Sequence, residues 1–275
     1  METYDPAAHY DRVTEAWGLL LGEELHYGLF TTGEEPLARA TAALTEAMID
    51  AARLGPGLSV LDVGCGSGAP ACRLAQEHGV EVLGITTSAV GVGAATERAR
   101  GLGLEGARFE QRDGTANELP DASFDRVWVM ESSHLMPDRE ALVAECARVL
   151  RPGGRMVLCD LVRRREIPFL ELRSRRREFA VLRAAFGAAR MDPLSSYASL
   201  ASAHGLQVDL ERDITTETRP TFDRWLANAE AHRAEVTGIL GEQSVAEFEE
   251  SCRILEAFWD DGTLGYGILA AGKPA

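Results

Sequence analysis

A chain of 275 residues with 45% hydrophobic content is long and apolar enough to bury a large core, as one domain or as one domain with a lid. Its formal net charge of −15 at pH 7 argues against duplex DNA or an anionic membrane as the main partner, because binding to phosphates depends on Lys and Arg. We therefore expect a small-molecule substrate.

The number and spacing of the cysteines predict reduced thiols rather than disulfides or a metal site. The chain has five of them, and no two form a C-x-x-C pair that would indicate zinc. No basic segment leads into an apolar leader, and no apolar run reaches the ~18 residues that a membrane span needs. We expect a cytoplasmic protein without a metal, and no pattern predicts its oligomeric state.

The N-terminal segment from Tyr4 to Phe30 mixes aromatic with charged side chains and is too apolar to be a free tail. It can be a helix packed on the core by its aromatic rings or a lid over a ligand, and both can hold at once. In the lid interpretation, the expected substrate-binding residues are Tyr10, Trp17, His26 and Tyr27. A helix from Pro36 to Arg53 then ends at the breaker Gly55-Pro56-Gly57.

The stretch from Val60 to Pro70 predicts a strand, a tight turn and a helix, because an apolar run breaks into three alternating glycines before a helix-starting proline. Glycines let a ligand approach the main chain, and the N–H groups of a helix that starts near Ala69 favour an anionic group on that ligand. The pattern Gly64-x-Gly66-x-x-Ala69 also matches the dinucleotide fingerprint.

Two features outside the glycines favour S-adenosylmethionine over a nicotinamide dinucleotide or a purely structural turn. Asp62 precedes the first glycine by two residues, which gives D-x-G-x-G-x-G. The next expected strand, Val80 to Ile85, runs into Thr86-Thr87-Ser88, where a dinucleotide enzyme would place the acid that binds its ribose.

Strands and helices alternate up to residue 162. After the glycine turn, the expected helices are 71–78, 88–102 and 138–150, and the expected strands are 80–85, 107–111, 124–130 and 155–161, with a turn at 151–154. This order predicts a parallel sheet covered on both faces, with ligands at the carboxyl ends of its strands.

The alternation stops at the basic segment, where eight arginines lie between residues 163 and 183. Phe179, Leu182 and Phe186 recur there at helical spacing and predict an amphipathic helix with a basic face. This face is either solvated and paired with nearby Glu residues or a site for an anionic substrate. Two more strands are expected at 205–215 and 263–271, with helices between them that join the basic segment as a cap.

Four motifs in order resemble the class I S-adenosylmethionine-dependent methyltransferases over residues 55–162. They are Asp62-x-Gly64-x-Gly66-x-Gly68, Asp113-Gly114, Leu119-Pro120-x-x-x-Phe124-Asp125 and Leu150-Arg151-Pro152-Gly153-Gly154. Two flanking motifs are similar to the branch that holds the rebeccamycin sugar O-methyltransferase, tocopherol methyltransferases and the spinosyn cyclase. These are Leu25-His26-Tyr27-Gly28 and Glu131-Ser132-x-His134-x-Met136-Pro137-Asp138.

The resemblance implies an α/β, Rossmann-like sheet of seven mainly parallel strands in the order 3-2-1-4-5-7-6, with the last strand antiparallel. It also implies a division into four parts. These are an N-terminal helical lid (1–54), a cofactor-binding core (55–162), a helical cap (163–200), and the remaining core strands (201–275) with a helical insertion at 219–260.

By the same resemblance, S-adenosylmethionine is the cofactor, with its methionine part near Asp62, its ribose near Thr86 and Thr87, and its adenine near Asp113 and Gly114. The expected cofactor-binding residues are Asp62, Gly64, Cys65, Gly66, Gly68, Thr86, Thr87, Asp113, Gly114, Thr115 and Glu131. Many class I enzymes end the second strand with an acid, which is absent here, as it is in the branch that this chain resembles.

Methyl transfer needs an aligned acceptor and exclusion of water, and it needs a base only if the acceptor keeps its proton. His134, just past strand four, and Asp160, near the end of strand five, are the candidate catalytic residues. Each has a structural alternative, as a helix-entry hydrogen bond and as a structural acceptor.

We therefore predict methyl transfer to a hydroxyl, or to N or C, of a small secondary metabolite. The alternatives are a cyclase that keeps the cofactor without transferring its methyl, and a pure binding protein.

Overall fold

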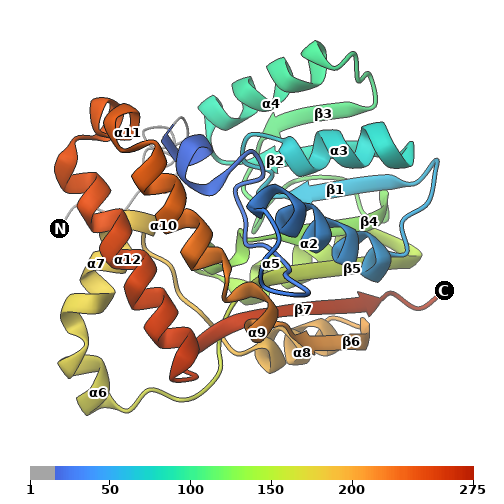
Figure 1. Ribbon diagram of the computed structural model, residues 1–275. Helices are drawn as coiled ribbons and strands as arrows, with labels where there is room; N and C mark the ends of the chain where they lie inside the picture. The colour runs from blue at the N-terminus through green and yellow to red at the C-terminus, as the bar shows by residue number, and fades with distance from the viewer. Residues whose placement is uncertain (1–15) are drawn as a thin grey trace.

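Seven strands form one sheet in the order β3-β2-β1-β4-β5-β7-β6 in the computed structural model, which describes residues 16–275 (Figure 1). Their bounds are β1 Ser59–Val63, β2 Glu81–Thr86, β3 Ala107–Gln111, β4 Phe124–Met130, β5 Leu150–Arg163, β6 Gln207–Asp213 and β7 Leu264–Gly272. Strand β7 pairs antiparallel with both β5 and β6, and the other pairs are parallel. The predicted strand order and the antiparallel last strand are confirmed.

Helices cover both faces of the sheet because successive side chains of each strand point to opposite faces. In β1, Val60 packs in the cluster with α2 (Leu37–Ala52) and α3 (Ala69–His78), and Leu61 packs with α5 (Arg139–Val149) and α8 (Leu194–Ala203). Helix α4 (Ala89–Gly101) packs beside α3 and on β3. The core therefore has two halves that the sheet separates.

The remaining helices form a lid beyond the carboxyl ends of the parallel strands (Figure 1). They are α6 (Phe169–Ser174), α7 (Arg176–Phe186), α9 (Thr215–Thr218), α10 (Thr221–Ala231), α11 (Arg233–Leu240) and α12 (Glu242–Asp260). Helices α7 and α12 pack together, with the rings of Phe179 and Phe258 5.4 Å apart. Between residues 16 and 275, no helix has the length and apolar character to cross a membrane.

The predicted turn at 151–154 was wrong, whereas the amphipathic helix predicted around Phe179 is confirmed as α7. Residues 151–154 belong to β5 rather than to a separate turn, because Leu150 already pairs with Phe124 and the irregular register between Phe124 and Arg126 takes up the bend. The basic segment forms two helices, since the backbone leaves helical geometry at Arg175 (φ −88°, ψ 10°) between α6 and α7.

Most arginines of the basic segment pair with carboxylates, as the solvated-face interpretation expects. The pairs are Arg163–Glu166, Arg164–Asp213, Arg165–Glu171, Arg175–Asp261 and Arg177–Glu250. These pairs favour a structural role for the basic face.

Candidate active site

The turn after β1 holds three glycines with positive φ, at 84° for Gly64, 52° for Gly66 and 76° for Gly68. Two are also fixed by packing, since a Cβ on Gly64 would lie 2.2 Å from the Ser132 Cβ, and one on Gly68 would lie 2.6 Å from the Ala95 Cβ. A Cβ on Gly66 would meet no atom within 4 Å. Gly66 is therefore the glycine whose main chain faces open space.

Asp62 lies on β1 just before this turn and is 3% exposed. Within residues 16–275, no group donates a hydrogen bond to its carboxylate, and burial raises its pKa from 3.8 to about 7. A buried carboxylate without a donor is costly unless a ligand supplies one. The site therefore suits a cationic or hydrogen-bond-donating group.

The predicted ribose and adenine residues lie at the adjacent ends of β2 and β3, where Thr86 pairs with Gln111. Thr87 accepts a hydrogen bond from the Gln111 side chain through its carbonyl oxygen. One carboxylate oxygen of Asp113 accepts from both the main-chain N and the hydroxyl of Thr115, each at 2.8 Å. Asp113 and Gln111 also line a hollow of about 460 Å³. The structure therefore brings Thr86 and Thr87 to the same edge of the sheet as this hollow.

Gly114 and Cys65 lie in closely packed surroundings. A Cβ on Gly114 would lie 2.6 Å from Cγ1 of Val63 and 3.2 Å from Cε of Met136. Burial raises the pKa of the Cys65 thiol well above its usual value, so the thiol stays neutral. A Cβ on Gly64 would also lie 3.7 Å from Cε of Met136, so this side chain is close to both the glycine turn and the loop after β3.

His134 and Asp160, the two candidate catalytic residues, are in direct contact. His134 lies in the short helix η1 (Ser133–Leu135) that follows β4, and Asp160 lies on β5. The Asp160 carboxylate accepts from His134 Nδ1 at 2.6 Å and from the His134 main-chain N at 3.1 Å. Nε2 of His134 has no hydrogen-bond partner among the described residues.

The charges of this pair stabilise each other. Burial lowers the pKa of His134, but the charge and hydrogen bond of Asp160 outweigh it, and the pKa of the imidazole is raised above 6.5. Burial likewise opposes the ionised form of Asp160, but His134 and the Ser133 hydroxyl hold the pKa of this carboxyl below its usual value. Asp160 is therefore ionised at neutral pH.

Glu131, expected at the cofactor, turns its carboxylate toward the lid. It directly follows β4 and has a positive φ of 46°. Its Oε1 accepts from the Tyr27 main-chain N at 2.7 Å and from the Tyr266 hydroxyl at 2.6 Å. Burial raises the pKa of Glu131. Its two hydrogen bonds connect the N-terminal segment to β7.

His26 is buried with both ring nitrogens against protein groups. Its Nδ1 lies 2.8 Å from the Tyr27 carbonyl oxygen, and its Nε2 lies 3.1 Å from the Glu24 carboxylate and 3.2 Å from the Thr45 hydroxyl. Burial lowers the pKa of His26, but these neighbours raise it overall. The contacts match the packing interpretation of this segment.

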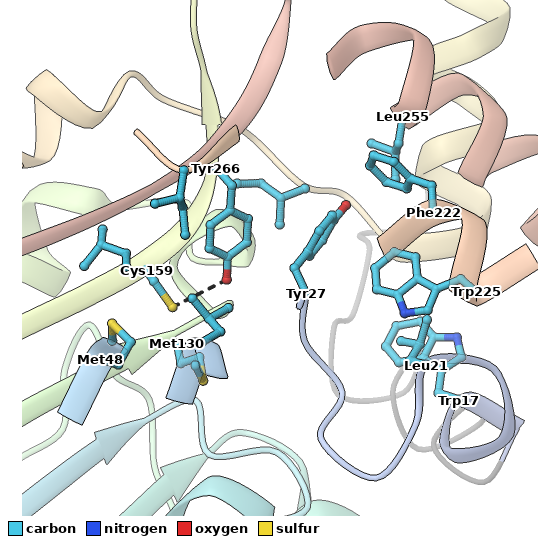
Figure 2. Close-up of a cluster of buried hydrophobic side chains, with 14 of the residues drawn as sticks. Trp17, Leu21, Tyr27, Met48, Met130, Cys159, Phe222, Trp225, Leu255 and Tyr266 are labelled. Atoms are coloured by element: carbon cyan, nitrogen blue, oxygen red, sulfur yellow. Dashed lines mark hydrogen bonds between the residues drawn. The ribbon is translucent and has the colours of Figure 1, made fainter. Parts of the chain in front are cut away.

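Tyr27 lies within an aromatic cluster between β7 and α10 (Figure 2). Its ring stacks on Trp259 at 5.5 Å and meets Trp225 edge-on at 4.7 Å. Its buried hydroxyl has no hydrogen-bond partner in the part of the chain that the structure describes. Trp17 is 5% exposed and lies 6.2 Å from the Phe186 ring, whereas Tyr10 falls outside the described residues.

Three residues beside the pair were missed by sequence reasoning. Ser133 and Tyr197 are fully buried near Asp160, and Arg139 is 6% exposed. Ser133 is adjacent to His134 in the sequence, so its position could have suggested a role. No spacing rule connects Tyr197, which α8 brings to the site from 64 residues away.

A family model described as "Methyltransferase domain" matches residues 61–158. The chain is 35% identical over 266 residues to the 27-O-demethylrifamycin SV methyltransferase of Amycolatopsis mediterranei, covering 96% of this chain and 95% of that one.

Two solved structures are similar over nearly the whole chain. The [4+2]-cyclase SpnF has a TM-score of 0.83 at 28% identity, covering 98% of this chain and 96% of that one. The mycolic acid cyclopropane synthase CmaA1, solved with S-adenosylhomocysteine, has a TM-score of 0.87 at 20% identity, covering 98% of this chain and 97% of that one, and is a likeness of fold alone.

Proposed function

Because this chain belongs to the class I S-adenosylmethionine-dependent methyltransferases of the natural-product type, we propose that it methylates a hydroxyl of a small secondary metabolite. We further propose that His134 removes the proton of that hydroxyl. The observation that carries the proposal is the buried His134–Asp160 pair, which leaves one imidazole nitrogen without a partner among residues 16–275, at the strand ends where this fold binds its ligands.

The residues at the glycine turn suit the cofactor of the family. The main chain at Gly66 faces open space that a Cβ would enter, and the buried Asp62 carboxylate lacks a donor that an ammonium group can supply. Asp113 keeps one carboxylate oxygen clear of Thr115 beside a hollow, where it can accept from a ribose or adenine donor. We also assign Thr86 to the ribose, because it lies at the same edge of the sheet, where it pairs with Gln111.

When bound, S-adenosylmethionine supplies an electrophilic sulfonium methyl group. The protein must then hold the acceptor in line and exclude water, which is a task of orientation. We assign the exclusion of water to the lid made by residues 16–54, the cap at 163–200 and the helices at 219–260, because these segments meet in the aromatic cluster around Tyr27.

The hydrogen bonds of His134 suit the role of a base that we propose for it. The ionised Asp160 can only accept, so Nδ1 of His134 carries a proton, and the lone pair of the neutral ring lies on Nε2. Nε2 can therefore accept the proton of a hydroxyl placed against it, and Asp160 stabilises the imidazolium that forms.

The name of a similar enzyme suggests which kind of acceptor to test first. The similar enzyme of Amycolatopsis mediterranei is named for 27-O-demethylrifamycin SV, and the two chains align over nearly their full lengths. We therefore propose an acceptor of the same kind, a natural product with a free hydroxyl.

A second candidate function is cyclisation without methyl transfer. It is favoured by the similarity to SpnF over 98% of this chain and by the apolar, aromatic lid, which suits an unsaturated substrate. Like the first proposal, it keeps S-adenosylmethionine bound at the glycine turn.

One experiment separates the two functions. The purified protein is incubated with S-adenosylmethionine and a panel of hydroxylated natural products that includes 27-O-demethylrifamycin SV, and S-adenosylhomocysteine is measured. Acceptor-dependent formation of S-adenosylhomocysteine supports methyl transfer. Conversion of a substrate to an isomer without S-adenosylhomocysteine supports the cyclase instead.

A further inference from the structure

A chain of hydrogen bonds extends from Asp160 away from His134 into the protein. The Ser133 hydroxyl lies 2.5 Å from Oδ2 of Asp160 and 2.8 Å from the Tyr197 hydroxyl. Nε of Arg139 lies 3.1 Å from the same Tyr197 oxygen. The four side chains come from η1, β5, α8 and α5, and none is more than 6% exposed.

The donor and acceptor of every bond in this chain are determined by its two ends. A guanidinium has no acceptor, so Arg139 donates to the Tyr197 oxygen. The single proton of Tyr197 then goes to its other partner, the Ser133 oxygen, and the proton of Ser133 goes to Asp160. The chain therefore runs in one direction, from a cation to a carboxylate.

Arg139 also holds the main chain on which His134 lies. Its guanidinium donates to the His134 carbonyl oxygen at 3.2 Å and to the Arg190 carbonyl oxygen, while the Arg190 main-chain N donates to the His134 carbonyl oxygen at 2.9 Å. Arg139 lies 3.6 Å from the Asp192 carboxylate as well. The residues between α7 and α8 are thereby fastened to the loop that carries the imidazole.

From this arrangement we propose that Ser133, Tyr197 and Arg139 are positioning residues that act through Asp160 on His134. The relay draws negative charge on Asp160 away from the imidazole and holds the carboxylate in one orientation. It therefore keeps His134 easier to deprotonate than a simple His–Asp pair would, so that more of the ring is neutral near pH 7. The inference rests on the proposed role of His134 as the base.

Charged groups on the elements packed around His134 act on its pKa in both directions, and Arg139 is the group that lowers it. Asp160 on β5 and Glu131 at the end of β4 favour the charged imidazole, and Arg139 on α5 opposes it. The α7–α8 linker contributes a main-chain N–H, since the Arg190 side chain pairs with Asp192. Arg139 is the one cation in this set, and the relay connects it to Asp160 through hydrogen bonds.

The test is the titration of His134, followed by NMR with labelled histidine in the full-length protein, with the His134→Gln spectrum assigning the signal. Ser133→Ala should raise the pKa of His134 by roughly half a unit to one unit, the net worth of one hydrogen bond. Tyr197→Phe should raise it by less, because the Ser133 proton still reaches Asp160. The double variant should match Ser133→Ala, since the relay is already cut.

Ser199→Ala is the matched control, because this exposed hydroxyl on α8 bonds only the Ser195 carbonyl oxygen, and the pKa of His134 should not change. An unchanged pKa in both relay variants would show that Ser133 and Tyr197 serve packing alone. Additive shifts in the double variant would also overturn the relay, because they mean independent actions. The titration needs no turnover, so a protein without methyl transfer would refute the proposed function and still test the relay.

Discussion

Replacing each glycine of the β1 turn by alanine should separate ligand binding from folding. All three positions have positive φ, which costs an alanine about 1–2 kcal/mol. At Gly66 this is the whole cost, because the added methyl meets nothing within 4 Å. With about 2–4 °C lost per kcal/mol in a chain of this size, Gly66→Ala should lower Tm by about 2–8 °C.

Gly64→Ala carries a further cost, since its Cβ would lie 2.2 Å from the Cβ of Ser132, which cannot swing away as a flexible side chain can. Overpacking of this kind adds about 1–3 kcal/mol, so its Tm should fall roughly twice as far as that of Gly66→Ala. Gly66→Ala should nevertheless lose more affinity for S-adenosylhomocysteine, because its methyl would occupy the space in which we propose that the cofactor binds.

Thermal unfolding and calorimetry with S-adenosylhomocysteine measure the two effects. Gly93→Ala on α4 is the control, since its Cβ also meets nothing but its φ is not positive. It should keep normal affinity and gain about 0.5–1 kcal/mol from better helix propensity. Wild-type affinity in Gly66→Ala, or a Tm lower than that of Gly64→Ala, would refute the reasoning.

Three further predictions follow from buried polar groups. Because burial raises the pKa of Asp62 from 3.8 to about 7, the ligand-free folded state binds the extra proton, and its stability should fall by up to ~4 kcal/mol as pH rises from about 4 to above 7. Asp62→Asn should flatten this part of the Tm–pH curve, and an unchanged slope would contradict the assignment. His134→Ala should lower turnover by at least ~10²-fold with cofactor affinity near normal, and the wild-type rate should decline as pH falls through a pKa above 6.5; a flat profile would mean that no histidine base acts. Tyr27→Phe removes a buried hydroxyl that has no partner among residues 16–275 and should raise the free energy of unfolding by ~1–3 kcal/mol, so a lower Tm would indicate a partner in solution.

The sequence predicted the sheet well because local signals and the family resemblance agree there. Alternating strands and helices predicted a parallel sheet, and the resemblance implied its strand order. The structure differs from the expected elements at boundaries such as Leu150 and Arg175. Those boundaries depend on strand pairing and on a single backbone bend, which periodicity does not register.

The residues of the candidate site also differ in how well the sequence could place them. His134 and Asp160 could be placed together because parallel strands end at one edge of the sheet. The orientation of Tyr27 could not, because an aromatic residue in a lid can face a ligand or the core, and only the rings of α10 and α12 determine which. Tyr197 was missed because its contact joins segments that no short motif connects.

The central claim is that this protein transfers a methyl group to a hydroxyl by means of His134. The most direct measurement follows S-adenosylmethionine with an isotopically labelled methyl group, incubated with a hydroxylated acceptor and the wild-type or His134→Ala protein. We expect labelled methyl on the acceptor oxygen, one S-adenosylhomocysteine for each product, and a rate at least ~10²-fold lower in the variant. An unlabelled, isomerised product, or equal rates in the two proteins, would contradict it.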